Sequence, residues 1–206
     1  MELLPVLLCR KAPFAAVVAD ASAAPWLHLE PQVLRLVVDG TKPEQSTSIR
    51  AGWESDRLRL LFTVEDNDPW ATLTERDALL YTEEVVEVFL DTEGDGEGYF
   101  EIEVNPNNAV LDCCARKIRS GYRKDFRWRC EGLETAVQMV PGGWVVELAI
   151  PFASLTSRMP QSGEQWRVNF TRIDRPKGKE RELSAWSPTG LAQFHVPQRF
   201  GFLRFE

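Results

Sequence analysis

Residues 82–112 read TEEVVEVFLD (82–91), TEGDGEG (92–98), YFEIEVN (99–105) and PNNAVLD (106–112). Apolar side chains alternate in two segments on either side of the glycine-rich turn: Val86, Val88 and Leu90, then Phe100, Ile102 and Val104. Pairing Leu90 with Phe100 places both apolar rows on one face, whereas a slip of one residue would separate them. This pattern predicts a hairpin with that register, followed by a third strand over residues 109–115.

The same register sets Glu87 directly across from Glu103 on the opposite face. Like charges opposed on a strand pair destabilise the ladder. Two carboxylates held there need a cation, an arginine, a ligand or a shared proton. We therefore interpret this face as a candidate binding site.

The composition is that of a globular protein rather than a nucleic-acid-binding or membrane-spanning one. The chain has 206 residues, of which 44% are hydrophobic and 27% charged, and a net charge of −7. An acidic chain is an unfavourable partner for nucleic acid, and no apolar run approaches the length of a membrane span. An acidic residue precedes the short apolar run at the N-terminus, the reverse of a secretory signal, so we expect a cytoplasmic protein.

The remaining chain predicts short strands separated by turn residues. They are expected over residues 33–38, 46–53, 57–64, 135–140, 144–150, 166–173, 182–186 and 199–205, with a helical turn after Ile150. With the central hairpin this makes about eleven strands, hence an all-β antiparallel β-sandwich of jelly-roll or immunoglobulin-like architecture with little helix. We predict a single domain over residues 1–206, in which residues 1–31 wrap a sheet edge. The long polar connection over residues 65–81 is of a kind that is often functional.

The acidic turn offers a second candidate site. Asp91, Glu93 and Asp95 alternate with other residues on a tight loop, as the oxygen ligands of Ca²⁺ do. The usual calcium loop also has a distant bidentate glutamate, which is missing here. Two interpretations are open for this turn. It binds Ca²⁺ through these three residues, or it is a solvated hairpin tip without metal.

Residues 116–129 contain seven basic side chains interleaved with Tyr122, Phe126 and Trp128. That pattern is typical of single-strand nucleic-acid grooves, and equally of a protected edge strand. Because the chain is acidic and has no known nucleic-acid motif, we expect no nucleic-acid partner.

The four cysteines, Cys9, Cys113, Cys114 and Cys130, show no CxxC spacing. We expect reduced structural thiols, the alternative being a bridge from Cys130 to one of the adjacent pair.

Catalytic motifs are scarce. The sequence has no nucleophile elbow, phosphate-binding loop or HExxH motif. Glu87 and Glu103 could act as the acid and base of a glycosidase, although directly opposed strand neighbours lie at the short end of the separation that such enzymes use. His28 and His195 are the only imidazoles, and isolated histidines are usually structural.

Six segments in this order resemble the family 9 carbohydrate-binding modules and their DOMON-like relatives: EEVVEVFLD, GYFEIEVN, WVVELAIPF, VNFTRID, SAWSPT and RFGFLRF. The resemblance covers roughly residues 33–205. It implies a β-sandwich that holds the end of a glycan between two aromatic rings, above polar side chains on the strands, with calcium supporting the fold. Stacking of a sugar on aromatic rings and pairing of its hydroxyls with carboxylates suit such a ligand.

When the family's binding residues are transferred one by one to this sequence, the β-sandwich framework is retained but several of the ligand-contacting residues differ. Tyr81 stands where the sugar binders have the first tryptophan, and Phe194 where they have the second. Glu87 matches the strand glutamate, but Glu103 replaces the expected arginine. Trp186 matches a tryptophan outside the ring pair, and Leu191 replaces an asparagine.

A basic residue expected before Trp186 falls on Lys179 or Arg181, and we place Arg181 and His195 on the rim. With Glu103 in place of the arginine, the strand face below the two rings is more acidic than in the sugar binders. This favours a cationic ligand, an amino sugar or a bridging metal.

The sequence thus predicts a non-catalytic carbohydrate-binding module whose ligand residues are Tyr81, Glu87, Glu103, Arg181, Phe194 and His195. The alternatives are an interaction or structural sandwich without a small ligand, and a glycosidase using Glu87 and Glu103. A fourth is a haem-binding DOMON relative, whose axial ligands would come from Met139, Met159, His28 and His195. A concave pocket around Tyr81 would favour the first interpretation, and a flat filled surface would favour the interaction sandwich.

Overall fold

The computed structural model describes residues 3–206, and these form a nearly all-β structure. The strands are β1 (Val6–Lys11), β2 (Gln32–Val33), β3 (Arg35–Leu36), β4 (Thr47–Trp53), β5 (Arg57–Glu65), β6 (Val85–Asp91), β7 (Gly98–Val104), β8 (Val110–Ile118), β9 (Gly121–Asp125), β10 (Glu134–Val140), β11 (Gly143–Pro151), β12 (Gln165–Asp174), β13 (Glu182–Ala185) and β14 (Gly201–Phe205). The helical segments are α1 (Phe152–Leu155) and the 3-10 turns η1 (Trp26–His28), η2 (Leu80–Thr82) and η3 (Pro197–Arg199). Every helix within residues 3–206 is too short to cross a bilayer.

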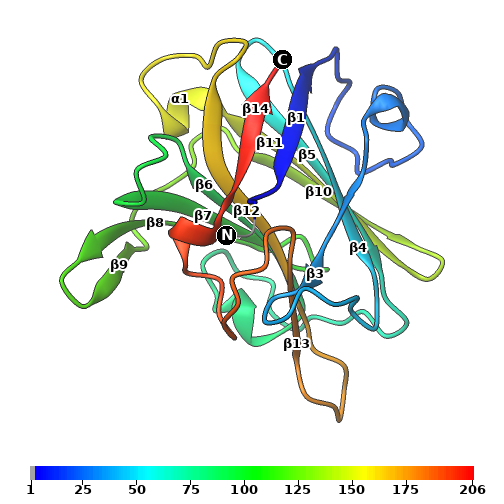
Figure 1. The fold of residues 1–206 in the computed structure, drawn as a ribbon. Helices are drawn as coiled ribbons and strands as arrows, with labels where there is room; N and C mark the ends of the chain where they lie inside the picture. Colours follow the sequence, from blue (N-terminus) through cyan, green and yellow to red (C-terminus); the bar gives the residue numbers. More distant parts are fainter. Residues whose placement is uncertain (1–2) are drawn as a thin grey trace.

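The strands follow one another in the order β10-β11-β5-β4-β1-β14-β12-β6-β7-β8-β9, and this curled sheet folds into two layers (Figure 1). The predicted β-sandwich is confirmed. The pairing is mixed rather than purely antiparallel, because β1 runs parallel to both β14 and β4 and so joins the two layers.

The interior between the layers is filled by the predicted alternating rows. Val86, Val88 and Leu90 of β6 pack in one cluster with Phe62 of β5 and Trp144 of β11. Trp186, which the resemblance placed outside the ring pair, belongs to this cluster and packs against Phe170, with 5.6 Å between the ring centroids.

The predicted role of residues 1–31 needs correction. Residues 6–11 do not wrap an edge but form β1 inside the sheet, where Leu7 and Cys9 point into the core. Trp26 and Leu29 then cover a face rather than an edge, packing on Leu61 and Val145 of β5 and β11. The sequence did not predict this strand, because residues 6–9 (VLLC) are apolar on both faces and so lack the alternation of apolar and polar residues. Residues 1 and 2 lie outside the described part of the chain.

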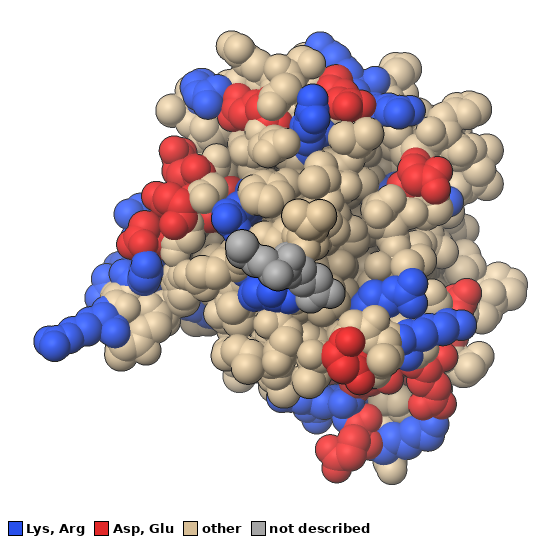
Figure 2. Space-filling model, viewed as in Figure 1, with Lys and Arg blue, Asp and Glu red and all other residues tan. Residues whose placement is uncertain are grey.

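Two other expectations changed. The strand predicted over residues 33–38 is split, because β2 pairs with β4 in one layer and β3 with β13 in the other. The basic segment forms the end of β8 and the unpredicted β9, which is the last strand of the sheet, so the edge-strand interpretation is correct. Lys and Arg side chains gather on this projecting ribbon (Figure 2).

The outer face of the β6–β7–β12 layer is covered by a second apolar cluster. It contains Phe89 and Tyr99 from the strands, Leu80 from η2, and Phe194 and Phe200 from the segment before β14. The loop that carries η2 and the segment before β14 therefore both lie over this face, and the candidate site lies between them.

Candidate functional site

The hairpin register is as predicted, with Glu87 opposite Glu103 and Leu90 opposite Phe100. A third carboxylate, Glu101, joins the pair, and oxygen atoms of the three residues lie within 4.8 Å of one another. All three side chains are buried. The sequence reasoning missed Glu101, although its position two residues before Glu103 on the same strand face would have indicated it.

The partners of the three carboxylates differ. Lys124 of β9 lies 2.8 Å from Glu101, and the Thr171 hydroxyl donates to Glu87 Oε2 at 2.6 Å. Glu103 is 0% exposed, and neither of its carboxylate oxygens has a hydrogen-bond partner among residues 3–206. An unpaired buried carboxylate is costly, and such groups commonly hold a proton.

The electrostatics follow from this arrangement. Burial, reinforced by the charge of Glu101, raises the pKa of Glu87 to about 8. Burial and the charges of Glu87 and Glu101 raise the pKa of Glu103 well above its usual value. The floor of the site therefore binds protons at neutral pH unless a cation replaces them.

A cavity of about 320 Å³ lies over this floor. Its lining includes five of the six predicted ligand residues: Tyr81, Glu87, Arg181, Phe194 and His195. Glu101 and Lys124 line it as well, whereas Glu103 lies outside the lining. The sixth predicted residue is thus close to the cavity but too deeply buried to contact a ligand in it.

Tyr81 is held in place by the long connection before β6. Leu80 anchors η2 in the apolar cluster, and Glu83 accepts hydrogen bonds from the backbone N–H groups of Thr72 (2.7 Å) and Leu73 (3.2 Å). These contacts fix the loop against the sheet and leave the Tyr81 ring half-buried at the cavity, with Lys124 Nζ 5.9 Å from its centroid.

Phe194 and His195 form the opposite wall. Phe194 is only 6% exposed and packs against Phe89, so it offers far less open ring surface than the predicted second stacking ring. The His195 Nδ1 lies 3.0 Å from the Tyr99 hydroxyl, and burial lowers the pKa of His195. Arg181 is exposed, as expected of a rim residue, and Leu191 is exposed outside the cavity lining.

A second cavity of about 500 Å³ adjoins the first along β13 and shares Arg181, Leu183 and Ala192 with it. These shared residues make the two linings continuous.

The predicted metal ligands of the acidic turn, Asp91, Glu93 and Asp95, line one cavity, but they are not among the clusters of converging ligand atoms found in the described residues. Asp91 is buried, and its two carboxylate oxygens accept the backbone N–H groups of Gly94 (2.7 Å) and Gly96 (2.9 Å). Glu93 and Asp95 are exposed. The alternating pattern thus reflects a turn closed by Asp91, which cannot turn both oxygens to a metal without breaking these bonds.

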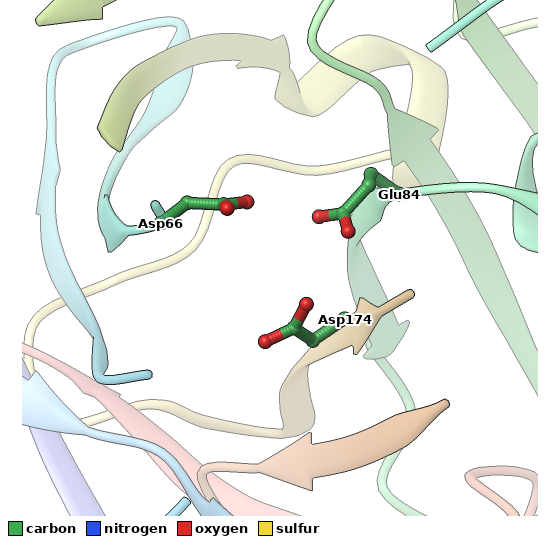
Figure 3. Close-up of side chains that lie close together, drawn as sticks. All are labelled: Asp66, Glu84 and Asp174. Carbon is green, nitrogen blue, oxygen red and sulfur yellow. The ribbon is translucent and has the colours of Figure 1, made fainter. Parts of the chain in front are cut away.

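A different set of carboxylates, not foreseen from the sequence, converges beside the start of β6. Figure 3 shows Asp66, Glu84 and Asp174 pointing toward one another. Arg172 Nη2 lies 2.8 Å from Asp66 and 3.5 Å from Glu84, and all these side chains are buried. The guanidinium occupies the place that a metal ion would need, so this cluster is an internal ion network.

The residues named for the other interpretations lie elsewhere. Met139, Met159 and His28 are exposed and do not line the cavity, so of the four candidate axial ligands only His195 lies at it. The four cysteines, all in the described part of the chain, are free thiols.

Comparison with known proteins agrees with this geometry. Residues 19–206 match the family described as carbohydrate family 9 binding domain-like. The chain belongs to this family. Among curated proteins, the chain is 22% identical over 184 residues to the endo-1,4-beta-xylanases A of Thermotoga maritima and Thermotoga neapolitana. The match covers 87% of this chain and 16% of each xylanase.

Solved structures share the family 9 fold. A family 9 carbohydrate-binding module from Caldicellulosiruptor kristjanssonii, solved with cellotriose, superimposes with a TM-score of 0.75 at 17% identity, covering 98% of this chain and 94% of that one. A putative carbohydrate-binding protein from Bacteroides uniformis gives a TM-score of 0.79 at 20% identity, covering 98% and 99%.

Proposed function

We propose that this family 9 domain is a non-catalytic carbohydrate-binding module that holds a glycan, or the end of one, in the cavity between Tyr81 and the Phe194 wall. The observation that carries the proposal is the concave cavity itself. It places a half-buried aromatic ring above strand carboxylates, on the face where the domain's loops meet. The Caldicellulosiruptor module, which has the same fold, was solved with cellotriose and with glucose.

The chemistry of the cavity suits a sugar. An aromatic ring can stack on the C–H face of a pyranose, and Glu87, Arg181 and His195 can pair with its hydroxyls. A flat surface would have favoured the interaction sandwich, and the cavity around Tyr81 is hollow instead.

A glycosidase role is disfavoured by the placement of Glu103. Two carboxyl groups must reach the glycosidic bond from the cavity, and Glu103 is 0% exposed and absent from the cavity lining. The Glu87–Glu103 pair therefore lacks a second accessible group, and Glu101, which does line the cavity beside Glu87, is ion-paired with Lys124 at 2.8 Å.

The test is a glycan-array screen of the purified chain, followed by titration calorimetry with each oligosaccharide retained. We expect retention of at least one glycan class, competed by the same soluble oligosaccharide. A chain that retains no glycan on a broad array, while remaining folded by circular dichroism, would overturn the proposal.

A further inference from the structure

We propose that the ligand of this site is an amino sugar, that is, a glycan carrying free amino groups, one of which binds Glu87 as an ammonium while the sugar ring lies against Tyr81. This inference rests on the proposed function and adds the chemical class of the ligand.

The first reason is the charge of the cavity floor. Glu87 and Glu101 line the cavity, and Glu103 lies within 4.8 Å of both. Lys124 neutralises Glu101 at 2.8 Å, and the Thr171 hydroxyl is Glu87's hydrogen-bond partner. Glu87 therefore has a neutral hydrogen-bond donor but no ion pair of its own among the described residues, and Lys124 and Arg181 act on its charge only from a greater distance. An ammonium of the ligand would supply this ion pair.

The second reason is Glu103. It is fully buried, its two oxygens have no partner among residues 3–206, and it lies opposite Glu87 on the neighbouring strand. Glu103 cannot contact a sugar in the cavity, but burial and the neighbouring carboxylates keep a proton on the Glu87–Glu103 pair. An ammonium that binds Glu87 can replace that proton, whereas a neutral sugar supplies no cation to replace it.

Lys124 indicates which kind of cation the floor accepts. Its ammonium already lies against Glu101, so the cluster binds a primary amine in this structure. A divalent ion between the three carboxylates would be repelled by that ammonium, which shares Glu101 with it. A second amine that approaches from the cavity reaches Glu87 without displacing Lys124.

The adjoining cavity extends the same charge. Its lining holds five carboxylates and two basic side chains: Asp39, Glu44, Asp174, Glu180 and Glu182, against Lys179 and Arg181. A longer oligomer of amino sugars would thus meet further carboxylates along β13, whereas a neutral oligomer would gain only van der Waals contacts and hydrogen bonds there.

The pH dependence of binding has a definite sign. The charged or titratable groups that face Glu87 are Glu101, Glu103, Lys124, Arg181, His195 and the Tyr99 hydroxyl. Burial raises the pKa of Glu87 to about 8, so an incoming ammonium must displace a proton below that pH. Affinity for an amino sugar therefore rises with pH until the amine of the ligand begins to lose its own proton, and it falls above the pKa of Glu87.

The experiment compares three β-1,4-linked tetramers that differ only at C2: the glucosamine tetramer with an amine, the N-acetylglucosamine tetramer with an acetamide, and cellotetraose with a hydroxyl. Titration calorimetry at about neutral pH should give at least about tenfold tighter binding of the glucosamine tetramer, as for one charge-assisted contact. Between about pH 5 and about pH 7, where the sugar amines stay largely protonated, its affinity should rise, and that of the neutral tetramers should not.

Three variants locate the effect. Glu87→Gln should remove most of the preference for the amine. Glu103→Gln removes the competing carboxyl group beside Glu87 and should shift the rise in amine affinity to lower pH, while leaving the affinity for cellotetraose unchanged. Glu30→Gln changes the net charge equally at an exposed position outside the cavity and should keep the preference. A thermal melt of each variant confirms that it is folded.

The outcomes separate the two proposals. If cellotetraose or the acetylated tetramer binds as tightly as the amine, or if Glu30→Gln lowers the preference as much as Glu87→Gln, the amino-sugar inference is wrong and glycan binding stands. If none of the tetramers and no arrayed glycan binds, both proposals are wrong.

Discussion

Glu87 and Glu103 lie opposite each other on β6 and β7 because the apolar rows on the reverse face of the two strands fix that register. Shifting either strand by one residue would bury a carboxylate between the sandwich layers and expose valine or isoleucine. The fold therefore holds a like-charge pair in place at the expense of stability. Such a cost is typical of a functional position rather than a structural one.

The first prediction concerns stability against pH. The pKa of Glu103 is raised by burial and by Glu87 and Glu101, so the native state keeps a proton that the unfolded chain releases. The stabilisation from such a group is complete below the unfolded pKa and is lost as the pH rises through the native pKa. We expect Glu103→Gln to become increasingly more stable than the parent between about pH 5 and about pH 8, by about 1.4 kcal/mol per unit by which the native pKa exceeds the unfolded one.

Urea unfolding of both proteins across this range measures the difference directly. Glu30→Gln is the control, because Glu30 is exposed and its substitution should shift neither curve. A difference that stays constant with pH, or that favours the parent as the pH rises, would contradict a proton on this pair.

How far the sequence predicts the structure depends on whether each signal is local. The hairpin and Glu87 opposite Glu103 follow from side-chain alternation, which a strand pair converts directly into geometry. The position of β1 inside the sheet does not follow from alternation, because its parallel partners β14 and β4 are far away in the sequence. The same alternation predicts that Glu101 lies on the face of Glu103. The position of Lys124 beside Glu101 is predictable only if the pairing of β9 with β8 is known.

The site residues divide in the same way. Tyr81, Arg181 and His195 line the cavity where the family resemblance placed them. The burial of Phe194 and the closure of the acidic turn by Asp91 depend on packing and on backbone N–H directions that residue types alone do not specify.

Tyr81 should contribute directly to ligand binding. Tyr81→Ala removes the half-buried ring that faces the cavity, and we expect the binding free energy for a retained glycan to weaken by about 1–2 kcal/mol. Phe126→Ala is the control, because Phe126 is 42% exposed and lies outside the cavity lining. Calorimetry that shows unchanged affinity for Tyr81→Ala, or an equal loss for both variants, would remove Tyr81 from the site.

Asp91 should stabilise the hairpin turn without calcium. Asp91→Ala leaves the backbone N–H groups of Gly94 and Gly96 without their acceptor, and we expect a loss of about 1–3 kcal/mol in unfolding free energy. Asp95→Ala, at an exposed position of the same turn, should cost about 0.5 kcal/mol or less. Thermal melts with calcium and with a chelator should coincide for the parent; a higher melting temperature in calcium that disappears in Asp91→Ala would restore the metal interpretation of this turn.

Arg172 should be the most sensitive position outside the site. Its guanidinium contacts Asp66, Glu84 and Asp174, and burial, which exceeds the effect of these contacts, raises the pKa of Glu84 to about 8. Arg172→Met removes the cation and leaves three buried carboxylates whose oxygens lie within 4.8 Å of one another. We expect a loss of about 3–5 kcal/mol in unfolding free energy, as for a buried ion pair that loses one partner.

Calcium should rescue this variant in part, because three converging carboxylates supply the oxygen ligands that a hard cation requires once the guanidinium is gone. The parent should not respond through this cluster, because Arg172 fills it. Arg158→Met is the matched control: Arg158 pairs with Glu164 at 2.7 Å but is 65% exposed, so its loss should cost about 1 kcal/mol or less. Denaturant unfolding of the three proteins with and without calcium decides the point, since equal losses for the two variants, or no calcium response in Arg172→Met, would show that Arg172 does not stand in for a metal ion.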